Sequence, residues 1–324
     1  MRADITPPTT GDSAVEWGVP GSKLTTMREA VTRFIPDGTS VCLNTGIEAL
    51  IPFAAGHELI RQRRRDLTLI GPISDILFDQ LVGAGCVRRI IAAWVGNVSA
   101  GLGHNYRRAV EHAVPVPVEV QDHSNLTIAL ALHAGALDVP YLPTRSLLGT
   151  DLLHSNPTFK EAADPWSGAP LVLVPALVPD VAVLHVQRAD EDGRAHVWGT
   201  LGVTREAALA ARQVIVVAEE IWPRERILSD PGLVLTPETK VVAVVHQPFG
   251  AFPSPVQGYY RRYHDFFRRF HDETRTVEGN RAWLERWVFG VDDWRGFLDR
   301  VGPEVLEQVR IRQPLLSEPL DYGA

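Results

Sequence analysis

The chain has 324 residues, of which 45% are hydrophobic and 22% are charged, proportions that exclude collagen-like, low-complexity and intrinsically disordered proteins. Acidic residues outnumber basic ones by 39 to 32, for a formal net charge of −7, and such a surface disfavours nucleic acid as a partner. The only two cysteines, Cys42 and Cys86, exclude a disulfide framework and a cysteine-based zinc site and favour a reducing compartment.

Two features of the sequence bear on where the protein works. No apolar run reaches the roughly 18 residues that a membrane-spanning helix needs, so we expect no membrane partner. Residues 1–21 hold Asp4 and several Pro and Thr residues but no hydrophobic segment, which is unlike a secretory signal. We therefore expect residues 1–21 to form a loose leader and the protein to be cytoplasmic.

Short apolar runs alternate with amphipathic segments along most of the chain. Thr26 and Glu29 have the spacing of a capping box, so a helix is predicted to begin there. The later elements expected in chain order are a strand over 41–43, a helix over 52–64, a strand over 67–70, a helix over 76–82, a strand over 89–94, a helix over 106–112, an extended segment over 116–120, a helix over 124–136, strands over 171–174 and 181–186, a helix over 204–211, and strands over 214–218 and 241–245. Because the strands are continuous apolar runs, they indicate an α/β fold, a mostly parallel sheet with helices on both faces.

The composition changes towards the C-terminus, where charged and aromatic residues dominate. We expect an α/β domain over 22–258 and a helical extension, packed on that domain, over 259–324. Tyr263, Phe266 and Phe270 have helical spacing, which favours a helix that docks an aromatic face on the core. A subunit contact remains an alternative, because aromatic residues and Arg are enriched in interface cores.

Turns that follow three of the predicted strands are candidates for substrate binding. Parallel sheets bind ligands where their strands end, and backbone N–H groups in such turns can hold a phosphate or an oxyanion. The candidate residues are Asn44, Thr45 and Gly46 after the first strand, Gly71 and Pro72 after the second, and Gly96 and Asn97 after the third. The alternative is that these glycines serve turn geometry alone. Neither GxGxxG after the first strand nor GxxxxGK[ST] occurs, which disfavours a dinucleotide-binding domain and a P-loop.

Charged residues supply two further candidates. Glu219 and Glu220 follow the predicted strand over 214–218, which places two carboxylates near the cleft, with a structural ion pair or a helix cap as the equal alternative. Arg61 and the run 63–65 are interpreted as a solvated helix end, with an anion contact as the weaker alternative. Neither HExxH nor GxSxG occurs, so a metal site and an α/β-hydrolase triad have no support.

Several stretches of the sequence agree, in order, with one enzyme family. The most diagnostic is His185-Val186-Gln187-Arg188-Ala189-Asp190, running on through Gly193 to Gly199. Others are Ile51-Pro52-Phe53-Ala54-Ala55-Gly56-His57-Glu58, Arg65-Asp66-Leu67-Thr68-Leu69, Gly83-Ala84-Gly85-Cys86, Leu148-Gly149-Thr150-Asp151, Glu219-Glu220-Ile221 and Val256-Gln257-Gly258-Tyr259-Tyr260. Over roughly Ser22 to Phe267 the chain resembles the α (A) subunit of class I coenzyme A transferases of the glutaconate CoA-transferase type.

The resemblance implies a NagB/RpiA/CoA-transferase-like fold and a heteromeric enzyme, usually α2β2, that moves CoA from an acyl-CoA to a carboxylate. A glutamate that belongs to the β chain attacks the thioester, giving a mixed anhydride and then a glutamyl-CoA thioester, from which an acceptor carboxylate takes the CoA. Coenzyme A enters as the acyl-CoA substrate, and no permanently bound cofactor or metal is expected. The loop after the second strand reads Gly71-Pro72-Ile73-Ser74 without a glutamate, so we expect no catalytic residue in this chain and a β partner that supplies it.

Three positions depart from the family pattern. The loop 44–47 reads Asn-Thr-Gly-Ile where the family commonly has Gly-Gly-Phe, Arg194 replaces Asn, and Phe252 replaces His. The acyl group and the acceptor acid stay open, and Ile47, Phe53 and Trp94 are candidates to line an acyl pocket. Two alternative functions also stay open: a subunit of an acyl-CoA (ring-opening) hydrolase on the same fold, and a non-catalytic scaffold subunit.

Overall fold

Parallel strands form the centre of the protein, as expected. The structure is a computed structural model that describes residues 21–43, 45–73, 75–235 and 238–312; most of the expected leader, Asn44, Ser74 and the end of the extension lie outside them. Within the described residues one sheet contains, in spatial order, β13 (Val241–His246), β12 (Gln213–Ile221), β10 (Val181–Ala189), β1 (Ser40–Cys42), β2 (Leu67–Ile73), β3 (Val87–Trp94) and β6 (Glu119–Asp122). These seven are parallel, and β11 (Ala195–His196) adds an antiparallel pair to β10.

The direction in which strands are added reverses at the centre of the sheet. Val41 of β1 pairs with Leu69 of β2 on one side and with Val181 of β10 on the other. From β1 the chain builds outward through β2, β3 and β6, and from β10 it builds the opposite way through β12 and β13. Ligands of open parallel sheets bind outside the carboxyl ends of the strands at such a reversal.

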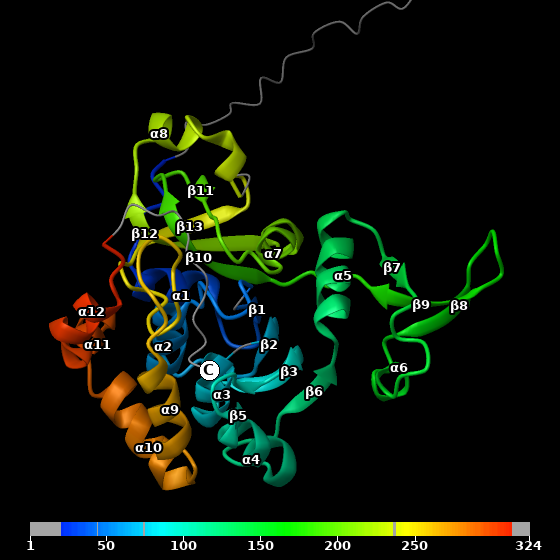
Figure 1. The fold of residues 1–324 in the computed structure, drawn as a ribbon, viewed down its shortest axis with the longest axis horizontal. Coiled ribbons are helices and arrows are strands. Elements are labelled where there is room, and N and C mark those ends of the chain that lie inside the picture. Colours follow the sequence, from blue (N-terminus) through cyan, green and yellow to red (C-terminus); the bar gives the residue numbers. More distant parts are fainter. Residues whose placement is uncertain (1–20, 44, 74, 236–237, 313–324) are drawn as a thin grey trace, which may run out of the picture.

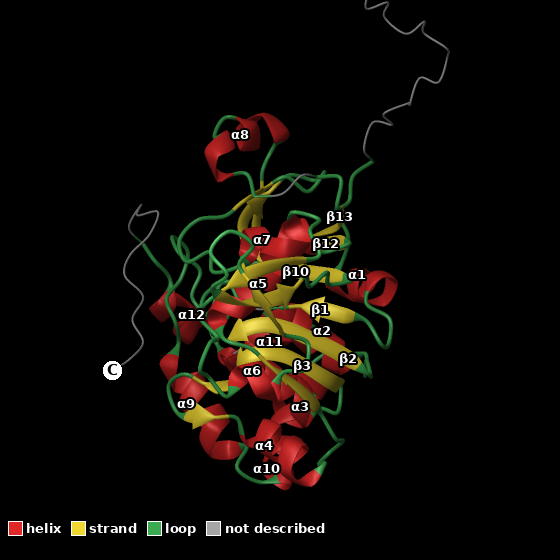
Figure 2. Cartoon of the chain, turned by 90° about the vertical axis from the view of Figure 1, so that its right-hand side faces the viewer, coloured by secondary structure: helices red, strands yellow, loops and turns green. Residues whose placement is uncertain are grey.

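Helices cover both faces of the sheet, which confirms the predicted α/β class (Figure 2). One face carries α1 (Met27–Phe34), α2 (Phe53–Arg61) and α3 (Asp75–Gly83), and the other carries α5 (Asn125–Ala136) and α7 (Thr204–Ala210). The capping box of Thr26 and Glu29 is present at the start of α1, and Ser124 caps α5. The remaining helices are α4 (His104–His112), α6 (Leu152–Ser155), α8 (Arg224–Leu228), η1 (Pro231–Leu233), α9 (His264–Glu273), α10 (Val277–Leu284), η2 (Glu285–Phe289), α11 (Trp294–Val301) and α12 (Pro303–Val309).

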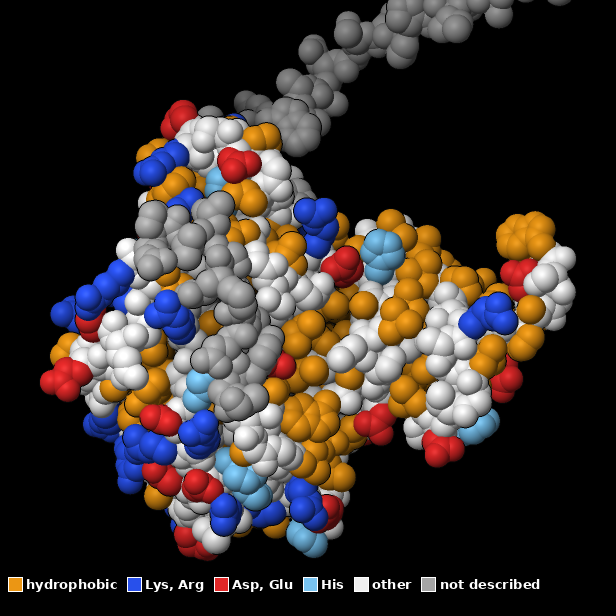
Figure 3. Space-filling view, viewed as in Figure 1, with side chains coloured by type: hydrophobic (Ala, Val, Ile, Leu, Met, Phe, Trp, Pro, Cys, Tyr) orange, Lys and Arg blue, Asp and Glu red, His pale blue; other side chains and the backbone are white. Residues whose placement is uncertain are grey.

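A small antiparallel sheet projects from the body, and we call residues 141–175 the arm (Figure 1). It contains β7 (Tyr141–Thr144), β9 (Pro170–Pro175) and β8 (Lys160–Ala163), in that spatial order. Its inner face packs on α5 in a separate apolar cluster that includes Phe159 and Val172. The expectation that 171–174 joins the parallel sheet was therefore wrong: the run is continuously apolar because both faces of β9 are apolar. Figure 3 shows hydrophobic side chains gathered over the arm and the adjoining body.

Several predicted boundaries need correction. Strand β2 continues to Ile73, so Gly71 and Pro72 lie inside it, and β12 continues through Glu219 and Glu220 to Ile221. Gly96–Asn97 forms β4, a short hairpin with β5 (Gly101–Leu102). For β2 and β12, ladder pairing with neighbouring strands extends the strand beyond the apolar run that marked it in the sequence.

Two other boundaries also differ. The helix predicted over 52–64 ends at Arg61, and Arg63 adopts a positive φ of 54° that a helix cannot contain. The segment predicted as extended over 116–120 becomes a strand only at Glu119, because Pro115 and Pro117 lack the N–H group that a ladder needs.

The C-terminal helices pack on the sheet as one continuous core. Phe266, Phe267 and Phe270 of α9 are buried, and Tyr263 is half-buried beside them. The ring of Phe266 lies 5.0 Å from that of Trp283 in α10. The docking helix predicted from the aromatic spacing is confirmed. No helix in the described part of the chain is both long and apolar enough to span a bilayer.

Candidate functional site

The turn after β1 meets the segment after β10 at the reversal point of the sheet. The Val203 N–H donates to the Thr45 carbonyl at 2.8 Å, and the Thr45 and Thr204 hydroxyls lie 2.8 Å apart. A Cβ atom on Gly46 would lie 2.5 Å from the Ala49 carbonyl oxygen, so only glycine fits there. Thr45 and Gly46 thus lie where the fold predicts a ligand, while Asn44 is outside the described residues.

The backbone is strained at the carboxyl ends of β1 and β2. Ile47, Leu50 and Asp75 have positive φ angles of 67°, 58° and 46°, a region that costs a non-glycine residue about 1–2 kcal/mol. The segment after β13 holds the first turn in place, since the Leu50 N–H donates to the Pro255 carbonyl at 3.0 Å. Strain of this kind concentrates at functional sites, and here it lies at the edge of the sheet that the topology selects.

A buried ion pair joins the end of β2 to the C-terminal segment. Arg262 Nη1 lies 2.6 Å from Asp75 Oδ2, and the two side chains are 2% and 0% exposed. Burial raises the pKa of Asp75, and the charge of Arg262 opposes that shift. The Arg262 guanidinium also stacks 3.5 Å from the Phe267 ring and donates to Ser99 Oγ. Asp75 is therefore enclosed and paired with a buried cation.

Glu48 supplies a second carboxyl group at this edge. It is half-buried, and burial raises its pKa, with the nearby Asp75 adding to the rise and Arg262 opposing it. Its Oε2 atom is buried and has no hydrogen-bond partner in the part of the chain that the structure describes. The turn after β1 therefore holds a carboxyl group that takes up a proton more readily than an ordinary Glu.

Glu219 is a buried junction between three segments. Its carboxylate accepts hydrogen bonds from the Tyr260 hydroxyl at 2.6 Å and the Phe249 N–H at 2.7 Å, and its Oε1 lies 2.7 Å from His185 Nε2. Burial, and then the charge of Glu219, raise the pKa of Tyr260 well above its usual value. Glu219 thus links β10, β12 and the segment after β13, and its burial separates it from solvent.

Glu220, the next residue, has a different environment. Its side chain is 43% exposed and lies 3.7 Å from Arg188 Nε, and Trp222 Nε1 donates to it at 2.6 Å. The Arg188 guanidinium stacks 3.7 Å from the Trp222 ring, and the attraction between the cation and the ring favours this position of the guanidinium. Of the two predicted cleft carboxylates, the structure places only Glu220 within reach of solvent.

The other predicted loop residues have well-defined neighbours. Gly71 pairs with Ala92 in the β2–β3 ladder, and Pro72 is buried beside it. Gly96 lies against the Trp94 ring, where a Cβ atom would come within 2.6 Å, and Asn97 Nδ2 donates to the Phe267 carbonyl at 2.5 Å. These contacts fix the hairpin after β3 against α9.

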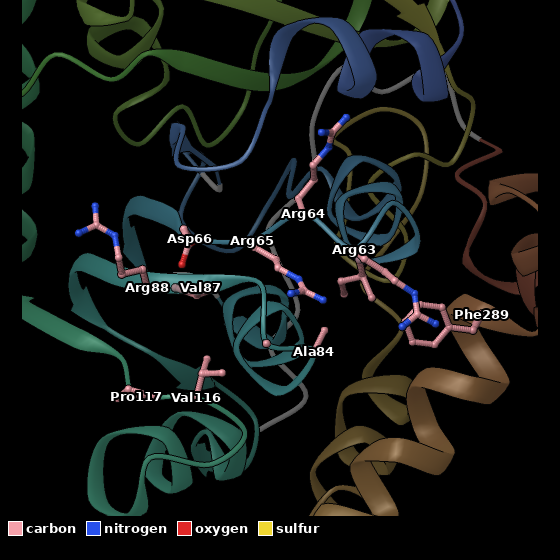
Figure 4. A pocket seen from close by; sticks show the side chains of 12 residues that line it. Arg63, Arg64, Arg65, Asp66, Ala84, Val87, Arg88, Val116, Pro117 and Phe289 are labelled. Carbon is pink, nitrogen blue, oxygen red and sulfur yellow. The ribbon is translucent and has the colours of Figure 1, made fainter.

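The basic run lines a cavity at the opposite, amino edge of the sheet (Figure 4). This cavity has a volume of about 590 Å³ and is lined by Arg63, Arg64, Arg65 and Arg88, among others. Arg64 donates to Gln62, Arg63 stacks 5.2 Å from the Phe289 ring, and Arg61 outside the cavity pairs with Glu58 at 2.5 Å. Arg61, Arg63 and Arg64 are thus held by side-chain contacts, whereas the sequence predicted a solvated helix end.

A profile of the coenzyme A transferase family matches residues 24–247. The chain belongs to the coenzyme A transferase family. It is 39% identical, over 280 residues, to the A subunit of the 3-oxoadipate CoA-transferase of Pseudomonas knackmussii, a match that spans 86% of this chain and 98% of that one.

Two further relatives are informative. The glutaconate CoA-transferase of Acidaminococcus fermentans has an A subunit that is 29% identical over 90% of this chain and 95% of its own. The crystal structure of that enzyme superposes with a TM-score of 0.84 over 92% of this chain and 98% of that one. The cholesterol ring-cleaving hydrolase IpdA subunit of Rhodococcus jostii is 24% identical over 75% of this chain and 84% of its own.

These matches confirm the family and the subunit type that the sequence motifs indicate. The geometry of this coenzyme A transferase chain adds residues that the sequence did not reveal. Asp75 begins α3, two residues beyond the end of β2 at Ile73, and a correct prediction of that strand end would have drawn attention to it. Arg262 carries no such signal, because it lies 187 residues further along the chain.

One predicted pocket residue is corrected. Phe53 is fully buried, with its ring 6.3 Å from that of Phe267, so it cannot line an open acyl pocket, whereas Ile47 and Trp94 are partly exposed. Among the described residues, no group of three or more His, Cys, Asp or Glu side chains is arranged to hold a metal ion.

Proposed function

We propose that this chain is the A-type subunit of a heteromeric CoA-transferase that moves CoA between an acyl-CoA and a free carboxylate. The observation that carries the proposal is the 39% identity to the A subunit of a 3-oxoadipate CoA-transferase, which extends over 98% of that relative. We further propose an α2β2 assembly and a cytoplasmic location. The free, buried thiols of Cys42 and Cys86 support a reducing environment.

In the proposed reaction the nucleophilic glutamate belongs to the B-type partner. Its carboxylate attacks the thioester carbonyl and expels CoA thiolate, which then attacks the resulting anhydride to release the free acid and leave a glutamyl-CoA thioester. Reversal with an acceptor carboxylate completes the transfer. The support in this chain is that the carboxylate at the start of α3, Asp75, which lies two residues beyond the end of β2, is buried and paired with Arg262.

Reconstitution tests this function. The chain is co-expressed with a B-type polypeptide of the same family from the same genome, and acyl exchange is measured between acyl-CoA donors and free acids, with 3-oxoadipate as the first acceptor. We expect exchange only when both chains are present. Robust CoA transfer by the isolated chain would contradict the proposal, because it would require a nucleophile within this chain.

The likeness to a ring-cleaving hydrolase subunit favours one second candidate, a hydrolase in which water replaces the acceptor acid. Release of free CoA without any acceptor would support the hydrolase. Trapping a covalent glutamyl-CoA thioester, followed by its discharge to an added carboxylate, would support the transferase. A complex that is inactive in both assays, although its partner retains the glutamate, would indicate a scaffold subunit.

A further inference from the structure

The outer face of the arm is apolar, although nothing in the described chain covers it. Directly paired residues of a sheet share a face, and successive residues alternate between faces. Val172 and Val174 are buried on the inner side, so Leu171, Leu173 and Pro175 point outward. Their cross-strand neighbours on that outer face are Tyr141, Pro143, Lys160 and Ala162. An antiparallel sheet with one face in water normally carries polar residues there, and this face carries a single charge.

The tip of the arm adds the most exposed large hydrophobic side chain among the described residues. Trp166 is 91% exposed. The turn that carries it is well ordered, because the Asp164 carboxylate accepts hydrogen bonds from the N–H groups of Trp166 and Ser167 at 3.1 and 2.7 Å. An exposed indole on a hydrogen-bonded turn is the kind of side chain that anchors protein interfaces.

The arm lies beside the carboxyl edge of the sheet. Asn156 Nδ2 donates to the Asp122 carbonyl at the end of β6 at 2.7 Å, and the Phe159 ring lies 5.1 Å from that of His123. Exposed apolar side chains continue along this edge. They are Val98 at 37%, Leu102 at 40% and Leu126 at 49% exposed, and Figure 3 shows the hydrophobic surface that joins body and arm.

The size of the arm shows how far its contact must extend. The strands β7, β9 and β8 have four, six and four residues. With strands about 4.8 Å apart and about 3.4 Å per residue, they give a face of about 230 Å². A stable interface buries about 800 Å² on each partner. A partner seated on the arm must therefore also cover the adjoining apolar edge, which brings it over the carboxyl ends of the strands.

We infer that the outer face of the arm, with Trp166 at its tip, docks the B-type chain of the enzyme and seats it over the carboxyl edge of the sheet. This inference rests on the proposed function, which requires a residue from another chain at that edge. A second copy of this chain is the competing occupant. The relatives favour the B-type chain, because the matching chains of the 3-oxoadipate and glutaconate CoA-transferases are named as A subunits.

The test uses two double variants with matched charge. In the first, Tyr141→Lys and Trp166→Lys alter the arm at side chains that are 46% and 91% exposed. In the control, Leu228→Lys and Val277→Lys alter α8 and α10 at side chains that are 45% and 36% exposed. Circular dichroism and the unfolding midpoint of each isolated chain establish that both variants fold.

Affinity for the B-type chain is then measured by isothermal titration, and the mass of each isolated chain by native mass spectrometry. We expect the arm variant to bind the partner at least about 30-fold more weakly, and the control within about twofold of the unaltered chain. Equal loss in both variants, unchanged binding in the arm variant, or no binding by the unaltered chain would overturn the inference.

A homodimer that the arm variant dissociates, with binding of the B-type chain unchanged, would also overturn the inference in favour of a second copy. Failure of the proposed function can be distinguished from failure of the docking inference. If the unaltered complex assembles through the arm but transfers no CoA, the docking site stands and the transferase assignment falls. If the complex transfers CoA but assembles through another face of this chain, the transferase assignment stands and the docking site falls.

Discussion

Glu219 and Glu220 are adjacent in sequence, yet their side chains occupy opposite environments. Successive side chains of a strand point to opposite faces, so one carboxylate turns into the protein and the other towards Arg188 and solvent. The buried one contacts three groups, the Tyr260 hydroxyl, the Phe249 N–H and His185 Nε2, and all three are buried. The pair therefore offers a matched comparison between a junction and a surface residue.

We expect Glu219→Gln to lower the free energy of unfolding by about 1–3 kcal/mol, because an amide nitrogen would face a donor and leave it unsatisfied. Glu220→Gln should change it by less than about 0.5 kcal/mol. Urea unfolding of the two isolated variants, followed by circular dichroism, measures both values. Equal losses would mean that the Glu219 hydrogen bonds add nothing beyond those of an exposed side chain.

At the scale of elements, one helix holds two layers of the molecule together. His57 in α2 lies 2.8 Å from the Gln80 side chain of α3, and its ring is 5.2 Å from that of Trp294 in α11. Burial lowers the pKa of His57 to about 3, and the charge of Arg61 adds to this shift. The neutral imidazole is thus part of the contact between the sheet-covering helices and the C-terminal ones.

This shift predicts a pH dependence with a definite sign. Between pH 6.5, the ordinary value, and about 3, the unfolded chain binds a proton at His57 that the folded chain does not. The stabilisation is therefore fully present above pH 6.5 and is lost as the pH falls, by about 2 kcal/mol at pH 5.

Denaturant unfolding at pH 7 and pH 5 checks this. The His57→Gln variant, which keeps a donor for Gln80, should lose about 2 kcal/mol less between the two pH values than the unaltered chain. The same change at His112, whose side chain is 68% exposed, should leave the pH dependence as it was. An unchanged slope in the His57 variant would show that this residue does not remain neutral in the folded protein.

At the scale of the whole molecule, the C-terminal helices share a core with the sheet. Trp283 is 1% exposed, and its ring lies 5.3 Å from that of Phe270 and 5.7 Å from that of Trp287. Because this cluster continues into the residues that cover α2 and the sheet, we expect the extension and the α/β domain to unfold together.

We expect Trp283→Ala to cost about 3–5 kcal/mol through the cavity that it leaves. Trp166→Ala should change the stability of the isolated chain by less than about 0.5 kcal/mol, since its side chain is already in water. Tryptophan fluorescence and far-ultraviolet circular dichroism should report one coincident transition. An earlier transition in fluorescence alone would indicate that the extension unfolds independently.

Local patterns in the sequence were enough to predict the fold class, most elements of the central sheet, the helix cap at Thr26 and the start of a helix at Ser124, and its motifs indicated the family. Backbone hydrogen bonding and side-chain periodicity depend on near neighbours along the chain, which is why such patterns can be read without a structure. The errors occurred where segments distant in sequence determine the extent or the position of a strand. Strands β2 and β12 extend beyond their apolar runs because they pair with neighbouring strands. Strand β9 has the continuous apolar pattern of a strand that is buried on both faces, although it belongs to the arm.

Long-range packing alone accounts for the ion pair of Asp75 with Arg262, the burial of Glu219 beneath Tyr260, and the position of the arm beside the strand ends. Each of these brings together residues far apart in sequence, and no local pattern encodes such a contact. A buried charge requires a partner, and the partner of Asp75 comes from a distant segment of the chain.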